Sequence, residues 1–184
     1  MLETLQALDS ALVLQIQDTV RTPFLSAVLV PVSRAGDFGI FWNSLCVLLL
    51  LRRKTRRGAV VTLCGSALEY LLCEQVLKRV FLRPRPYLVL EGLAYLVPAE
   101  SSTCFPSGHA ASAFVCAYLL TRSFGKKGAL AYIPATLIAL SRVYVGVHYL
   151  SDVLAGAALG TLVGAAVWAA VRAYQKKHPA KQIL

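Results

Sequence analysis

The sequence predicts an all-α integral membrane helical bundle, and composition and charge pattern carry this prediction. Of the 184 residues, 57% are hydrophobic and only 15% are charged, and the mean hydropathy is +0.62. These values lie outside the usual range of soluble globular domains. The net charge of +10 comes from Lys and Arg residues that cluster between apolar runs, which is typical of oriented membrane proteins. We therefore expect one membrane-embedded domain over residues 1–184 and no nucleic-acid binding.

The first 36 residues are expected to form interfacial or short helices. Over residues 2–20, leucines recur at steps of three and four while polar residues occupy the other faces, which predicts an amphipathic helix. The next apolar stretch, residues 24–32, is too short to span a bilayer. The alternative is a single span over residues 11–32, which would place several polar side chains in the membrane.

Five further apolar runs are expected to span the bilayer and to form the catalytic helical core, residues 37–174. They cover residues 38–51, 58–77, 110–121, 128–147 and 149–171. The bundle should thus have about five spanning helices after the N-terminal interfacial or short helices, or six if residues 11–32 also span.

Basic residues predict the orientation of these spans. Clusters follow the first, third and fifth runs, at residues 52–57, 122–127 and 172–181. By the positive-inside rule they lie in the cytoplasm, together with a basic C-terminal tail, residues 175–184. The loop 83–105 then faces the opposite, extracytoplasmic side. Its Arg83 and Arg85 break the rule, and we expect that they serve a substrate.

His148 and Asp152 are the first candidates for chemistry. They stand four residues apart, so on a helix the carboxylate can hold the imidazole and orient it. Arg142 lies just upstream, and a cation beside an oriented histidine suits a phosphate. The alternative is a buried ion pair between helices. Ionisable groups in so apolar a chain favour a functional site.

Two upstream stretches complete the candidate site. Pro106-Ser107-Gly108-His109 precedes an apolar helical run, so backbone N–H groups at a helix N-terminus can bind an anion there. Lys78 and Arg85 belong to a dense basic cluster that ends in two prolines.

In order, Lys-x6-Arg-Pro, Pro-Ser-Gly-His and Ser-Arg-x5-His-x3-Asp match the three-part signature of the type 2 phosphatidic acid phosphatase superfamily. The chain resembles its small bacterial membrane members, above all the undecaprenyl pyrophosphate phosphatase group. The resemblance covers about residues 74–160. It implies an enzyme of the bacterial plasma membrane with its active site outside and its C-terminus in the cytoplasm.

The resemblance also implies the role of each residue. His148 would attack phosphorus to form a phosphohistidine, Asp152 would orient it, and His109 would protonate the leaving group and then activate water. The phosphoryl oxygens would be bound by Lys78, Arg85, Ser107, Gly108 and Arg142. No metal or other cofactor is expected, because three cations already neutralise the phosphate and no carboxylate cluster suits Mg²⁺.

Several residues near these motifs have open roles. Five cysteines show no paired spacing, and Cys104 is expected to be a free thiol in the loop beside the site. Glu74, four residues before Lys78, either positions its ammonium group or only stabilises the helix. For Glu69 a structural role is favoured.

The last helix carries a stripe of small residues. His148, Asp152, Gly156, Gly160 and Gly164 recur every four residues, so the face with the candidate pair continues as glycines. Such stripes let membrane helices approach closely. We expect this stripe to pack within the chain and not to form a dimer interface, which leaves a monomer or a weak homodimer as the oligomeric state.

The expected function is removal of a terminal phosphate from a membrane lipid, with undecaprenyl diphosphate favoured. The alternatives within the enzyme class are a phosphatidylglycerophosphate or phosphatidate phosphatase and a broad lipid phosphatase. Vanadium haloperoxidases resemble the same signature but are soluble. A lipid-binding or lipid-moving membrane protein without catalysis is the alternative from another class, and it would not need both histidines.

Overall fold

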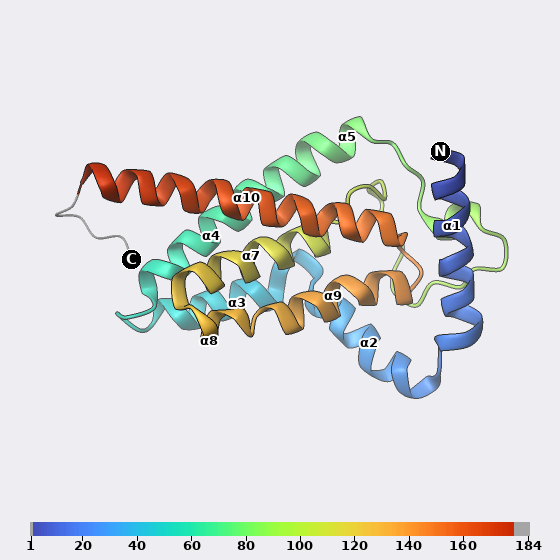
Figure 1. Ribbon diagram of the computed structural model, residues 1–184. Helices are drawn as coiled ribbons and strands as arrows, with labels where there is room; N and C mark the ends of the chain where they lie inside the picture. Colours follow the sequence, from blue (N-terminus) through green and yellow to red (C-terminus); the bar gives the residue numbers. More distant parts are fainter. Residues whose placement is uncertain (1, 179–184) are drawn as a thin grey trace.

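The computed structural model describes residues 2–178, which form helices joined by turns and one long loop, with no β-strand among them (Figure 1). The α-helices are α1 (Leu2–Gln15), α2 (Pro23–Ala35), α3 (Ile40–Leu50), α4 (Arg56–Tyr70), α5 (Lys78–Val80), α6 (Pro86–Val89), α7 (Gly108–Phe124), α8 (Lys126–Ala129), α9 (Tyr132–Tyr144) and α10 (Leu150–Lys177). Helical turns of other types cover Ile16–Val20, Asp37–Gly39 and Leu71–Leu77. The prediction of an all-α bundle is confirmed. The last six residues of the predicted basic tail lie outside the described residues.

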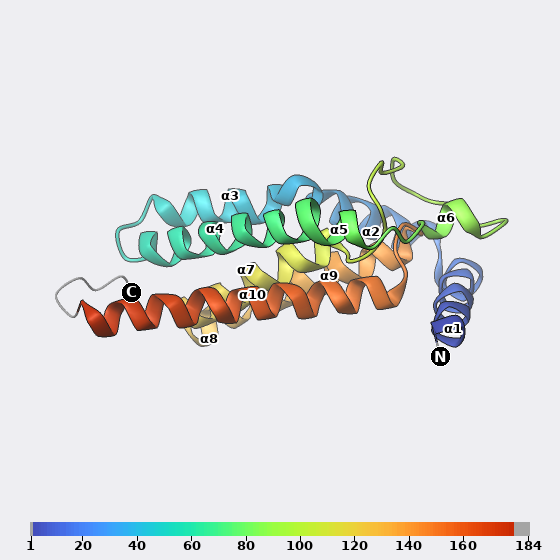
Figure 2. The same cartoon turned by 90° about the horizontal axis from the view of Figure 1, so that it is seen from above.

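Helix α7 is the centre of the bundle. It packs against α4, α9 and α10, and in Figure 2 α3 and α4 form one layer above the layer of α7, α9 and α10. The buried face of α7 is rich in small residues, with Ala110, Ala113 and Ala117 fully buried. Small side chains allow three helices to approach α7 at once.

Helix α1 stands across one end of the bundle (Figures 1 and 2). Asp9 and Val13 point inward and are 5% and 0% exposed, whereas Leu5 and Leu8 are 47% and 65% exposed. The helix expected from the sequence is present, and it docks on the bundle through a mixed polar and apolar face. Its interfacial position in a membrane stays a prediction.

The number of spans expected from the sequence stays a prediction. Among residues 2–178, two helical segments are long and apolar enough to cross a membrane, Arg56–Val80 and Leu150–Lys177. Helices α2 and α3 together make a third if the pair, bent by 61° at Gly36, counts as one broken span. Helices α7 and α9 have 17 and 13 residues, shorter than a full span.

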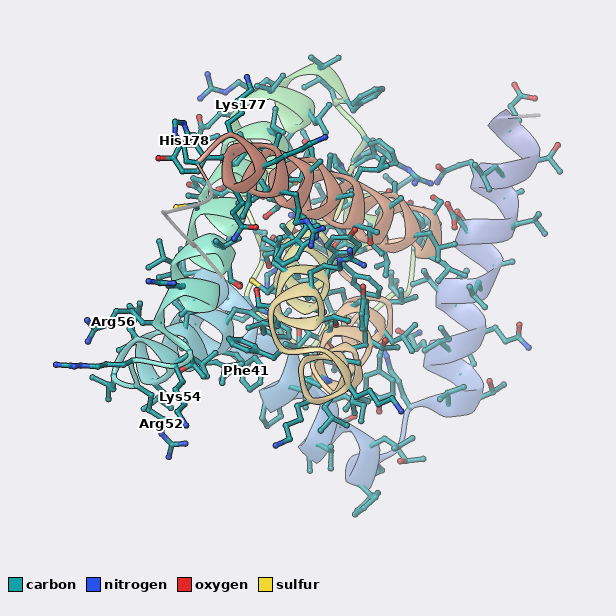
Figure 3. All side chains as sticks on the ribbon, turned by 60° about the vertical axis from the view of Figure 1, so that its left-hand side comes forward. Phe41, Arg52, Lys54, Arg56, Lys177 and His178 are labelled. Carbon is teal, nitrogen blue, oxygen red and sulfur yellow. The ribbon has the colours of Figure 1, made fainter. Side chains whose placement is uncertain are left out.

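Two of the basic clusters lie at the end of the bundle away from α1. Figure 3 shows Arg52, Lys54 and Arg56 at the turn between α3 and α4, and Lys177 at the end of α10 points out at the same end. Figure 1 places this end opposite α1 and opposite the start of α7. The charge separation expected from the sequence is therefore present within the folded chain.

Glycines in α10 bring its backbone against α7. A Cβ atom on Gly156 would lie 2.3 Å from the carbonyl oxygen of Ser107, and one on Gly160 would lie 2.1 Å from that of Ala111. A Cβ atom on Gly164 would lie 2.9 Å from the ring of Tyr118. The stripe therefore packs within the chain, as expected, and it fixes the start of α10 beside the start of α7.

Replacing Gly160 with Val should destabilise the protein by about 1–3 kcal/mol or more, because the side chain would overlap the α7 backbone. Thermal unfolding in detergent measures the loss. Ala158→Val is the matched control, since Ala158 is exposed on the same helix and should change little. Equal melting temperatures for the two variants would show that α10 does not depend on this contact.

Candidate active site

Three cationic side chains meet at the α1 end of the bundle. Lys78 lies in the last turn of the long helical segment Arg56–Val80, Arg85 precedes α6, and Arg142 lies in the last turn of α9. They are 6%, 1% and 1% exposed. Lys and Arg are almost never buried to this degree without partners, so the cluster requires anions.

Glu100 of the long loop is the anion that two of these cations bind. Arg85 Nη2 donates to its Oε2 at 2.6 Å, and Arg142 Nη2 donates to its Oε1. Burial opposes ionisation of this carboxyl, but Arg142 and Arg85 hold its pKa below the ordinary value. The carboxylate thus occupies the position between two guanidinium groups in which a phosphate would fit.

Lys78 has the partner that the sequence proposed for it. Its Nζ lies 2.7 Å from Glu74 Oε1, one helical turn earlier, and it also donates to Ser102 Oγ at 3.2 Å. The contact that positions the ammonium group is therefore present.

Ser107 and Gly108 bring the start of α7 to the same place. Ser107 is the N-cap residue of α7 and is fully buried, and its Oγ has no hydrogen-bond partner among the described residues. A Cβ on Gly108 would lie 2.5 Å from Glu74 Oε1. A free hydroxyl and a bare backbone at a helix N-terminus are the donors expected of an anion site.

His148 precedes α10 and faces the arginines. Its Nε2 lies 3.3 Å from Arg85 Nη1, and its side chain is 1% exposed. Burial, and then Arg85 and Arg142, lower the pKa of the imidazole well below its usual value. His148 is therefore neutral at pH 7, with a lone pair available on one ring nitrogen.

Asp152 lies next to the other ring nitrogen. Its Oδ2 is 3.7 Å from His148 Nδ1, which is a contact and not a hydrogen bond. Oδ2 accepts from the Tyr149 backbone N–H at 2.8 Å and from Cys104 Sγ at 2.7 Å. Cys104 is free, as expected, and it also lies 3.5 Å from His148 Nδ1. Burial, and then Asp152, raise the pKa of the thiol, which keeps it protonated.

The side chains of Cys104, His148 and Asp152 lie close enough together to hold a metal ion. They form the one such group found among residues 2–178. The candidate ligand atoms of Cys104, His148 and Asp152 lie within 4.8 Å of one another. The thiol already donates to the carboxylate, and the remaining Asp152 oxygen is bound elsewhere. A metal would have to displace both contacts, so the donor set fits a protonated hydrogen-bond network better.

Arg83 binds the remaining Asp152 oxygen, which the sequence did not predict. Its guanidinium donates to Asp152 Oδ1 at 2.5 Å and to Asp9 Oδ2 at 2.8 Å. It also lies over the ring of Tyr149, 4.2 Å from the centroid. The sequence predicts that Arg83 serves a substrate, but its guanidinium group pairs with the carboxylates of Asp152 and Asp9 instead. Arg83 thus links Asp9 of α1 to Asp152, the carboxylate next to His148.

His109 has a carboxylate partner of its own. Its Nε2 lies 2.9 Å from Oδ1 of Asp37, at the bend between α2 and α3. Gly36 permits this approach, since a Cβ there would lie 2.6 Å from the His109 ring. Asp37 belongs to none of the three sequence motifs. Its place between two glycines at a helix break was the available signal.

All eight residues named from the sequence lie at one end of the bundle, on α5, α7, α9, α10 and the loops between them. Fold and geometry define a helical membrane protein with a buried cation cluster and two histidines, each next to a carboxylate. The PAP2 superfamily model matches residues 59–176, and the chain belongs to this superfamily. The resemblance found in the three motifs is confirmed.

Individual relatives agree with this assignment. The chain is 35% identical over 150 residues to the decaprenylphosphoryl-5-phosphoribose phosphatase of Mycobacterium tuberculosis, covering 80% of this chain and 81% of that protein. It is 32% identical to an undecaprenyl-diphosphatase of Sulfolobus acidocaldarius, covering 76% and 67%. The crystal structure of a Bacillus subtilis phosphatidylglycerolphosphate phosphatase superposes with a TM-score of 0.72 at 31% identity, covering 95% and 88%. These relatives are membrane lipid phosphatases.

Arg83→Gln should lower kcat about 10-fold or more with little change in KM, because Asp152 would lose its cationic partner while the phosphate-binding side chains stay in place. Steady-state kinetics of phosphate release measures both constants. Arg83→Lys should recover part of kcat, and Arg79→Gln, on an exposed site nearby, is the control. A rise in KM alone would contradict this role and indicate that Arg83 contacts the substrate.

Glu100→Gln should strengthen binding of inorganic phosphate, because the incoming anion would no longer displace a carboxylate from Arg85 and Arg142. We expect the inhibition constant for phosphate to fall about 3- to 10-fold, on the scale of the net contribution of one hydrogen bond. Competition assays at fixed lipid concentration measure it. Weaker phosphate binding would show that Glu100 positions the arginines and does not block them.

Proposed function

We propose that this protein is a membrane lipid phosphatase that removes a terminal phosphate through a phosphohistidine on His148. The observation that carries the proposal is the placement of a buried, neutral imidazole against the Arg85 guanidinium, with His109 at the start of the neighbouring helix. A nucleophile, anion donors and a second proton carrier are what phosphoryl transfer needs.

The geometry supports Nε2 as the attacking atom. Nδ1 faces Cys104 and Asp152, whereas Nε2 faces the phosphate-binding arginines. In the first step Nε2 bonds to phosphorus, the bond from phosphorus to the leaving oxygen breaks, and His109 gives that oxygen a proton. In the second step His109 takes a proton from water, which attacks phosphorus and releases phosphate and His148.

Charge neutralisation comes from the protein itself in this mechanism. Lys78, Arg85 and Arg142 bind the phosphoryl oxygens, with Ser107 Oγ and the Gly108 N–H as further donors. Glu100 must leave the two arginines before phosphate binds. The mechanism requires no metal ion.

Two kinds of lipid are candidates for the substrate. The sequence favours undecaprenyl diphosphate, for which the Sulfolobus relative is named. The Mycobacterium relative is named for a phosphoribose lipid and the Bacillus structure for phosphatidylglycerolphosphate. The two kinds differ in the group to which the terminal phosphate is attached. In undecaprenyl diphosphate this group is a second phosphate, and in the other two lipids it is an alcohol.

We also propose the bacterial plasma membrane as the location, with the site on the extracytoplasmic side and the C-terminus in the cytoplasm. The basic turn of α3 and α4 and the basic end of α10 support this orientation, because they lie at the end of the bundle opposite the start of α7 (Figure 1). Residues 37–174 would form the catalytic core of the single domain, acting as a monomer or a weak homodimer.

His148→Ala should abolish phosphate release from every lipid at saturating substrate, since the nucleophile is lost. His109→Ala should lower the rate about 10²- to 10⁴-fold on phosphatidate and about 10-fold less on undecaprenyl diphosphate, whose phosphate leaving group needs a proton less. Phosphate release by each purified variant on both lipids measures the losses.

His178→Ala is the matched control, because this third histidine is exposed at the far end of α10. Retention of most activity by His148→Ala would refute the proposed function. Equal losses for His109→Ala on the two lipids would assign it to the water step alone.

A further inference from the structure

A cavity of about 600 Å³ opens beside the phosphate-binding cations and extends between α3, α4 and α7. Lys78, Glu100 and His109 lie at its rim, and Glu69 and Ser66 lie on its α4 wall. Because His109 is the proposed leaving-group acid, the cavity begins where the leaving group would depart. It is therefore the place for the part of the substrate that carries the phosphate.

Glu69 is the unexplained group in this cavity. Its side chain is 2% exposed, yet its Oε1 has no hydrogen-bond partner among the described residues. Buried polar atoms are almost always hydrogen-bonded, and an ionisable side chain within a membrane helix is costly. The structural role favoured from the sequence stays a prediction, and the structure places Glu69 on the cavity wall.

The charges around the cavity select the chemistry of the ligand. The two carboxylates at the rim already engage the cations: Glu74 pairs with Lys78, and Glu100 pairs with Arg85 and Arg142. Glu69 adds a carboxyl group that forms no ion pair among the described residues. A second phosphate in this space would therefore find no unpaired cation to bind, which is unfavourable in a buried site.

Neutral hydroxyl groups suit the same walls. A hydroxyl both donates and accepts, so it can pair with a carboxyl group in either protonation state. Ser66, Ser112 and Asn43 supply further hydroxyl and amide groups among apolar residues of the cavity. A few polar groups in an otherwise apolar pocket are typical of a site that orients a small ligand group.

We propose that the cavity binds the alcohol that bears the terminal phosphate, that this alcohol carries free hydroxyl groups as glycerol and sugars do, and that Glu69 binds one of them. The inference rests on the proposed function and selects between its two kinds of substrate. The preferred lipid is then a phosphomonoester of a hydroxylated headgroup, and undecaprenyl diphosphate is a poorer substrate.

Two lipids with the same acyl chains test the proposal. Phosphatidylglycerophosphate carries a free hydroxyl on the glycerol that bears its terminal phosphate, and phosphatidate carries none. In Glu69→Leu, kcat/KM should fall about 10- to 100-fold on the first lipid, the scale of one hydrogen bond to a charged group, and less than about 3-fold on the second. Glu69→Gln, which keeps hydrogen-bonding capacity, should lose less.

Leu63→Ala is the matched control, because Leu63 lines the same cavity without a polar group. It should affect both lipids equally. Thermal unfolding in detergent establishes whether each variant is folded. If Glu69→Leu does not fold, the comparison of the two lipids is made with Glu69→Gln.

Equal losses on the two lipids in the Glu69 variants, or no loss on either, would overturn the inference. So would a parent enzyme that prefers undecaprenyl diphosphate over both lipids. His148→Ala separates this result from the proposed function, because it should be inactive on all three lipids whatever Glu69 binds.

Discussion

The backbone contact between α7 and α10 is the constraint on which the site depends. Gly156 and Gly160 have no side chain to keep the helices apart, so the two starts of these helices lie together. His109 lies in the first turn of α7, and His148 lies two residues before α10. The contact between the two helices therefore brings both histidines to the same end of the bundle.

The buried charges are satisfied in pairs that cross the bundle. Each histidine has a carboxylate next to it, Asp152 for His148 and Asp37 for His109, and Arg83 joins Asp152 to Asp9 of α1. Asp9 and Asp37 belong to the first 58 residues, which lie before the segment that matches the family model. The N-terminal helices thus complete a site whose reacting groups all come from the matched segment.

Much of this site could be predicted from sequence because its residues stand at fixed spacings on helices. The i, i+4 pairs of Glu74 with Lys78 and Asp152 with His148 are local, and the motif order located the rest. Asp9 and Asp37 could not be found in this way, since their contacts join residues more than 70 positions apart in the chain. The residues of α1 that contact the bundle could not be identified for the same reason, because Asp9 meets Arg83 and Ser151 only in the folded chain.

The central claim is that His148 becomes phosphorylated during turnover. Rapid quenching of the parent enzyme and of His109→Ala with a lipid labelled in its terminal phosphate, followed by mass spectrometry under alkaline conditions, tests this claim most directly. We expect phosphate on His148 in both, and more of it in His109→Ala with a lipid for which the water step is slowed more than the first step. Turnover of the labelled lipid with no phosphate on His148, or with phosphate on another residue, would contradict the account.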